Sequence, residues 1–251
     1  MGNTYDNRVL LNVREQNPVR TTDGGGDATG RGTMFGEQAV APLSPDFHAV
    51  EGKYFSATTV PTTAATGVAG HPAPVAFIDT KPLVVFQNNN PIGSGIKIIL
   101  KRLQLRWTAV GAGGTLPRFF TALDPVTNRY TSGGVEITAK PNARGGSAVA
   151  SNAKIYHGVV VAPAASANQR ILKAGQIRPV IPVIYDELTF RFGDDTSPGV
   201  PAVLSGTLVA QQVIQHDPVV LDPQDSFLLH LWRASQSGAD SYEVDIGWIE
   251  R

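Results

Sequence analysis

Residues 102–109 read RLQLRWTA, and this stretch decides the fold class. Leu103, Leu105 and Trp107 alternate with polar residues, so apolar and polar side chains repeat with a period of two. Successive side chains of a β-strand point to opposite faces, whereas a helical face would repeat about every 3.6 residues. The stretch therefore predicts a strand with one face in a core and the other in water.

The same alternation recurs in ELTFRF (187–192) and YEVDIGWIER (242–251), and it places Trp107 and Trp248 in the core. Glycine (26 residues) and proline (18 residues) interrupt the chain too often for long helices. Further short apolar runs, separated by turn residues, cover 82–87, 97–100, 155–161, 177–185, 206–214 and 226–232. The sequence therefore predicts an all-β fold, an antiparallel β-sandwich of the jelly-roll-like class.

The first 50 residues differ from the rest, and we expect an extended N-terminal arm over 1–50 and a β-sandwich domain over 51–251. Residues 20–38 (RTTDGGGDATGRGTMFGEQ) are rich in glycine and hold only Met34 and Phe35 as large apolar side chains. Ordering such a segment costs chain entropy with little apolar burial in return. The arm is therefore predicted to lie on a neighbouring copy of the chain or, alternatively, to wrap its own domain.

Composition excludes several classes of function. The chain has no cysteine, so thiol nucleophiles, thiolate metal sites and disulfides are ruled out. Lysine plus arginine and aspartate plus glutamate both number 21, and this zero net charge provides no basic surface for nucleic acid or anionic membranes. No secretory signal or membrane-spanning run is present, so we predict synthesis in a host cytoplasm, without nucleic-acid or membrane partners.

No motif supports catalysis, a cofactor or a metal, so we predict a protein that is not an enzyme. The five histidines lack metal-ligand spacing. His157 and His230 lie in strand patterns and are expected to be packed, whereas His216, in QHDP, is expected in a turn. The carboxylates of GDD (193–195) and DPQD (222–225) fit turn-forming aspartates.

SFLLHLW (226–232) has two apolar or amphipathic faces, although a strand in a two-layer sandwich needs only one. A loop or another subunit must therefore cover its second face, and the sequence leaves both alternatives open. Together with the arm, this strand supplies the predicted interface residues, which are Arg8, Leu10, Leu11, Arg20, Met34, Phe35, Phe227, Leu228, His230 and Trp232.

Residues 218–251 read PVVLDPQDSFLLHLWRASQSGADSYEVDIGWIER. They resemble the C-terminal strand pair of small virion proteins of tailed bacteriophages, with a Pro/Asp-Ser turn, an LxLW-type strand, a Ser/Gly/Ala hairpin and a GWIER finish. The resemblance implies a head-decoration (cement) protein or a spike-like protein, commonly a jelly-roll homotrimer whose partner is the major capsid protein. It assigns sheet and interface positions to Ser226–Trp232 and Trp248–Arg251.

We therefore expect a virion structural protein on the head surface, a capsid decoration protein that stabilises the phage head. One alternative is the receptor- or glycan-binding head of a fibre, spike or adhesin, in which the loops around 131–147 and 192–201 would carry specificity. Another is a jelly-roll capsid protein, which the uncharged arm disfavours because arms that gather RNA are strongly basic.

Overall fold

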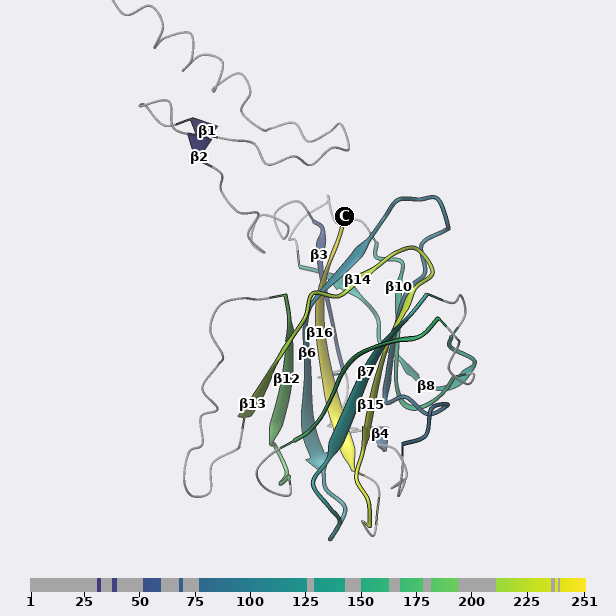
Figure 1. Ribbon diagram of the computed structural model, residues 1–251, viewed down its shortest axis with the longest axis vertical. Helices are drawn as coiled ribbons and strands as arrows, with labels where there is room; N and C mark the ends of the chain where they lie inside the picture. The colour runs from purple at the N-terminus through teal and green to yellow at the C-terminus, as the bar shows by residue number, and fades with distance from the viewer. Residues whose placement is uncertain are drawn as a thin grey trace, which may run out of the picture. The chain divides into compact units, whose positions relative to one another are not determined.

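The computed structural model describes the residues that build two β-sheets and their main connections (Figure 1). The described residues are 31–32, 38–39, 52–59, 68–69, 77–125, 129–142, 150–162, 168–177, 182–193, 211–235, 238 and 240–251. None of these residues is helical. The chain divides into two compact units, Met1–His48 and Ala49–Arg251.

The first unit contributes a short antiparallel pair, β1 (Arg31–Gly32) and β2 (Gln38–Ala39). The other arm residues lie outside the described part of the chain, so the extended arm and its boundary at residue 50 stay predictions. All the strands described below belong to the second unit.

One sheet of the second unit has six strands. Its spatial order is β11 (Arg170–Gln176), β7 (Arg118–Asp124), β15 (Ser226–Trp232), β5 (Val84–Asn88), β10 (Ala153–Val161) and β8 (Ser132–Glu136). Every neighbouring pair in it is antiparallel. β15 therefore lies at the centre of this sheet, between β7 and β5.

The other sheet has eight strands. Its main order is β13 (Gln211–His216), β12 (Glu187–Phe192), β6 (Ile98–Ala109), β16 (Ser241–Glu250), β3 (Tyr54–Thr58) and β9 (Lys140–Pro141). Two short strands join it, β14 (Val220–Leu221) against β6 and β4 (Val68–Ala69) against β16. Its pairs are antiparallel except for β12 with β13, which run parallel.

The two sheets pack face to face, and the alternation read from the sequence supplies the core between them. Leu103, Leu105 and Trp107 point inward from β6, while Arg102 and Arg106 remain exposed on the outer face. Rings from the two sheets meet in this core, as in Phe119 with Phe190, Phe86 with Trp248 and Phe192 with Phe227. Many consecutive strands also lie in different sheets, among them β5 and β6, β6 and β7, β11 and β12, and β15 and β16. The predicted all-β antiparallel sandwich is confirmed.

The second face of β15 is covered, in the described part of the chain, by residues of the same chain. Leu228 packs with Val85, Ala122 and Val160 in a smaller cluster on the outer side of the six-stranded sheet. His230 is 2% exposed, and the ring of Phe77, from the segment before β5, lies 4.8 Å from its ring centre. Of the two alternatives for this face, a covering segment of the same chain accounts for Leu228 and His230.

A buried asparagine network closes one end of the sandwich, where the chain leaves β5. The Asn88 amide donates to the Ile96 and Leu221 carbonyls, both at 3.0 Å, and its oxygen accepts from Asn90. Arg251 exchanges two backbone hydrogen bonds with Lys97 at the same end. The first described residues of the second unit also lie there, since Glu250 donates to the Lys53 carbonyl.

Candidate functional site

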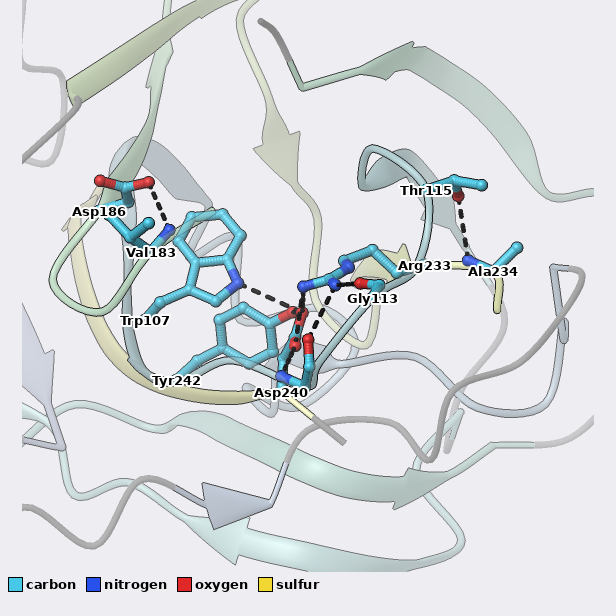
Figure 2. Close-up of polar contacts among 10 residues, drawn as sticks. Trp107, Gly113, Thr115, Val183, Asp186, Arg233, Ala234, Asp240 and Tyr242 are labelled. Carbon is cyan, nitrogen blue, oxygen red and sulfur yellow. Dashed lines mark hydrogen bonds and ion pairs between the residues drawn. The ribbon is translucent and has the colours of Figure 1, made fainter. Parts of the chain in front are cut away.

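The opposite end of the sandwich is built by three loops that follow β6, precede β12 and join β15 to β16. We call this region the loop end, and its described residues are 110–117, 182–186, 233–235, 238 and 240. Figure 2 shows side chains from all three loops converging there. The two most strongly defined features of the loop end are a buried ion pair and an exposed apolar turn.

Arg233 and Asp240, at the two sides of the β15–β16 hairpin, form the buried ion pair. Arg233 Nη1 lies 3.1 Å from Asp240 Oδ1, and the two side chains are only 1% and 3% exposed. Removing two charges from water is costly, and a buried pair persists only where further hydrogen bonds satisfy it. Asp240 meets this condition because it accepts bonds from three other groups as well.

The three further donors to Asp240 come from β6, its loop and β16. The Gly111 backbone N–H donates at 2.8 Å, the Tyr242 hydroxyl at 3.1 Å and the Trp107 indole N–H at 3.4 Å (Figure 2). Burial raises the pKa of Tyr242 well above its ordinary value, and the neighbouring Asp240 charge raises it further. Tyr242 therefore stays protonated and remains a donor to the carboxylate.

Arg233 fixes the loop after β6 from the other side. Its Nη2 donates to the carbonyls of Gly111 and Gly113. The loop then approaches the β15–β16 hairpin so closely that a Cβ on Gly111 would lie 2.1 Å from the Gly238 carbonyl oxygen. The ion pair thus holds two loops against each other, which makes this part of the loop end rigid.

The turn Val183–Asp186 is the second feature of the loop end. The Asp186 N–H donates to the Val183 carbonyl at 3.1 Å, and the Val183 N–H donates to the Asp186 carboxylate at 2.8 Å. Two more backbone bonds join it to β6, since the Tyr185 N–H donates to the Trp107 carbonyl and the Trp107 N–H donates to the Asp186 carbonyl. Two hydrogen bonds therefore close the four-residue turn, and two more hold it to the end of a central strand.

Tyr185 occupies this turn in a conformation that its side chain disfavours. Its φ is +75°, so the backbone at the third position of the turn is left-handed, as in a type II turn. This position normally takes glycine or asparagine. A non-glycine residue in this region costs about 1–2 kcal/mol. Val183, Ile184 and Tyr185 are nevertheless 56%, 49% and 60% exposed. The fold thus holds three consecutive apolar side chains in solvent on a strained, well-fixed backbone.

The described residues of the three loops expose no charge of their own. Among the described residues of the three loops, no lysine, arginine, aspartate or glutamate is exposed, because Arg233 and Asp240 are buried and Asp186 is half-buried and bonded within the turn. The exposed residues are instead small or apolar. Depletion of charge around aromatic and aliphatic anchors is the composition found at the centre of protein–protein contacts.

The structure distributes the predicted interface residues as follows. Phe227 lies in the core between the sheets, Leu228 and His230 are buried under residues of the same chain, and Trp232 is partly exposed beside Phe77. The interface role of these four stays a prediction, and Trp232 is the one with accessible surface. The predicted arm residues lie outside the described part of the chain; they are Arg8, Leu10, Leu11, Arg20, Met34 and Phe35.

The histidines agree with the sequence analysis in two cases and correct it in a third. His157 and His230 are packed, at 2% exposure each. His216 was predicted to lie in a turn, but it is the last residue of β13 and is equally buried. Its Nε2 lies 2.8 Å from the Thr121 hydroxyl, and its Nδ1 lies 2.9 Å from the Asp217 carbonyl, so it joins the edge strand β13 of one sheet to β7 of the other.

Sequence reasoning did not find the loop end. It placed Val183–Tyr185 in the apolar run 177–185, and in the structure these three residues belong to the turn that precedes β12. Asp186 was the available signal, because an aspartate at a turn position can accept from the backbone three residues earlier. Arg233 and Asp240 carried a second signal, as isolated charges that flank a small-residue hairpin between apolar strands.

The described residues show neither a metal cluster nor a membrane-spanning helix. Among them, no three histidine, aspartate or glutamate side chains are grouped to hold a metal ion, and no helix has the length and apolar character to cross a membrane. Known proteins gave no match either, since no protein-family model, curated protein or solved structure matches this chain.

Proposed function

We propose that the protein is a non-enzymatic structural component of a bacteriophage particle, a decoration protein that binds the assembled head and stabilises it. The observation that carries the proposal is the loop end, whose described residues expose no charged side chain and include the exposed, fixed turn Val183–Asp186. A surface of this kind suits binding to another folded protein surface. The resemblance of residues 218–251 to small virion proteins of tailed phages favours a particle as the setting.

The proposed mechanism is linkage between binding and assembly. A protein that binds the assembled shell and not its free subunits adds its binding free energy to the assembled state. Copies joined in a homo-oligomer reach their next site at a high effective concentration, so weak individual contacts combine into firm attachment. The partner in this proposal is the major capsid protein, and the location is the head surface.

The proposal is tested with particles that lack the protein. We expect them to lose their genome at a lower temperature than complete particles, and adding the purified protein should restore the resistance. Genome release followed by a DNA-binding dye during heating measures this directly. Equal release temperatures would remove the stabilising role.

A second arm of the test addresses the other predicted functions. The purified protein should bind complete shells and should not bind host cells or a panel of glycans. Binding to cells or glycans alone would replace the proposal with a receptor-binding head. Assembly of the purified protein into closed shells by itself would identify a capsid protein instead.

A further inference from the structure

The turn Val183–Asp186 has the properties of an anchor that is prepared for binding before its partner arrives. Four backbone or carboxylate hydrogen bonds fix its conformation, so little conformational entropy is lost when its side chains are buried. Tyrosine is also among the side chains that contribute most to binding when a partner encloses them. The free chain keeps the strain at Tyr185 while leaving that residue 60% exposed, so the folded monomer gains little apolar burial from it.

The same chain displays a second apolar surface, on the outer face of the six-stranded sheet. We call it the Phe77 patch, and it consists of Phe77, Ile78, Phe120 and Trp232. Phe77 and Ile78 are 39% and 38% exposed. The Phe77 ring lies 5.0 Å from the Phe120 ring and 5.6 Å from the Trp232 ring, with the buried His230 beneath it. The patch therefore offers a broad aromatic surface that the described residues leave partly uncovered.

We infer that the turn of one copy packs on the Phe77 patch of a second copy. The turn cannot reach the patch of its own chain, because its hydrogen bonds hold it to β6 in the eight-stranded sheet while the patch lies on the outside of the six-stranded sheet. The contact joins two different surfaces, so it is heterologous. Repeated around an axis, it closes a ring of identical subunits.

Three observations favour a second copy over other occupants. The chain itself carries the complementary apolar surface, and its zero net charge leaves no electrostatic barrier between copies. The exposed residues of the loop end are uncharged among those described, which matches the aromatic Phe77 patch. A membrane is disfavoured because a stable peripheral anchor combines apolar insertion with a cationic face, which the described residues of the loop end lack.

This inference rests on the homo-oligomer included in the proposed function, and it is tested on the purified full chain by light scattering across a wide range of concentrations. Ile184→Lys places a charge on the turn, Ile78→Lys places one on the patch, and Ile92→Lys is the control. Ile92 is 79% exposed and lies in the loop after β5, at the opposite end. We expect the first two variants to weaken association by roughly thirtyfold or more, and the control to match the parent.

Tyr185→Gly provides a second turn variant with an intact fold, since glycine suits the φ of +75°. It should associate as weakly as Ile184→Lys while its free energy of unfolding stays at or above that of the parent. Retained association in this variant would contradict the anchor role of the tyrosine.

Mixing distinguishes a heterologous contact from a symmetric one. Ile184→Lys keeps an intact patch and Ile78→Lys keeps an intact turn, so an equal mixture should form a species of two copies although each variant alone is monomeric. Weakened variants that the mixture does not rescue would show that the turn and the patch do not meet each other, and they would overturn the inference.

The remaining outcomes separate this inference from the proposed function. A parent that associates while both turn and patch variants associate equally well would overturn the contact and leave the oligomer standing. A parent that is monomeric at every concentration would overturn both the contact and the oligomer. Binding of the monomer to phosphatidylcholine vesicles, lost in Ile184→Lys, would assign the turn to membranes and overturn the inference as well.

Discussion

Tyr185 and Asp240 are both in energetically unfavourable positions at the loop end, but only Asp240 is compensated by its neighbours. Asp240 is a buried charge, and the structure supplies it with an arginine and three further donors, so its burial is compensated within the fold. Tyr185 is an apolar residue in a strained, exposed position, and nothing among the described residues compensates it. Natural sequences retain uncompensated strain mainly at sites that interact with something else.

Asp240→Ala should lower the free energy of unfolding by about 3–5 kcal/mol, because it leaves Arg233 buried without its counter-charge. The exposed pair Lys97–Asp222, whose side chains are 56% and 61% exposed, is the matched control. Asp222→Ala should cost at most about 1 kcal/mol. Urea unfolding of both variants measures the difference.

The double variant Arg233→Met/Asp240→Leu should recover much of the loss, because it removes both charges and refills the space with apolar groups. If it were as unstable as Asp240→Ala, the stability would come from the specific hydrogen bonds of the network and not from charge compensation. Similar losses in Asp240→Ala and Asp222→Ala would contradict the buried-pair argument.

The buried histidines predict a loss of stability in acid. Burial lowers the pKa of His157 from its ordinary 6.5 to about 4, and burial also lowers the pKa of His216. Between pH 6.5 and 4 the unfolded chain binds a proton at residue 157 that the folded chain does not. The free energy of unfolding therefore falls as pH falls through this window, by about 3 kcal/mol for His157.

Urea unfolding at several pH values between 7 and 4 measures this effect. His157→Gln, which cannot titrate, should show a shallower decline than the parent over the same window. Identical declines would place the acid sensitivity at other groups. The prediction concerns stability alone and does not depend on the proposed function.

At the scale of elements, the close contact between the two loops is asymmetric. A Cβ on Gly111 would lie 2.1 Å from the Gly238 carbonyl oxygen, a backbone atom that cannot rotate away, whereas a Cβ on Gly238 would meet nothing within 4 Å. Gly111 is therefore required by the packing of the loops, while Gly238 is replaceable.

Gly111→Ala should lower the free energy of unfolding by about 2 kcal/mol or more, since it forces the loop away from the hairpin and weakens the bond from Gly111 to Asp240. Gly238→Ala should change it by less than about 0.5 kcal/mol. Thermal unfolding of the two variants provides the comparison. Equal effects would mean that the loops separate without cost.

The strands were predictable from the sequence and the loop end was not, for a physical reason. Alternation in β6, β12 and β16 follows directly from burial on one face, so the order of apolar and polar residues alone reveals it. The turn at Val183 depends on two backbone bonds to Trp107, on a strand far earlier in the chain, and no local signal predicts a left-handed tyrosine. The prediction of a turn at His216 was wrong for a similar reason, because its contact with Thr121 on the other sheet is not visible in the local sequence.

On the scale of the whole molecule, the sandwich separates its two ends. The asparagine network, Lys53 and Arg251 lie at one end, and the loop end lies at the other. β6, with 12 residues, connects them over roughly 40 Å. Lys53, which accepts a backbone hydrogen bond from Glu250, therefore lies far from the exposed turn within this unit.

Removal of Met1–His48 should leave the free energy of unfolding of the remaining chain within about 1 kcal/mol of the parent value. Both buried clusters of the described residues lie within Ala49–Arg251, and a unit with its own core folds alone. Urea unfolding of the shortened chain is the measurement, and failure to fold would contradict the division into two units. Light scattering on the same sample tests the predicted arm exchange, which requires weaker association after removal.

The position of β16 has a consequence for biosynthesis. This strand, residues Ser241–Glu250, lies in the middle of the eight-stranded sheet, between β6 and β3. β6 and β3 each pair with β16 and not with each other, so a nascent chain holds them without this partner until residue 250 has left the ribosome. A chain released before β16 is made would have an open sheet, which proteases and chaperones recognise. Closure of the eight-stranded sheet therefore waits for the synthesis of β16.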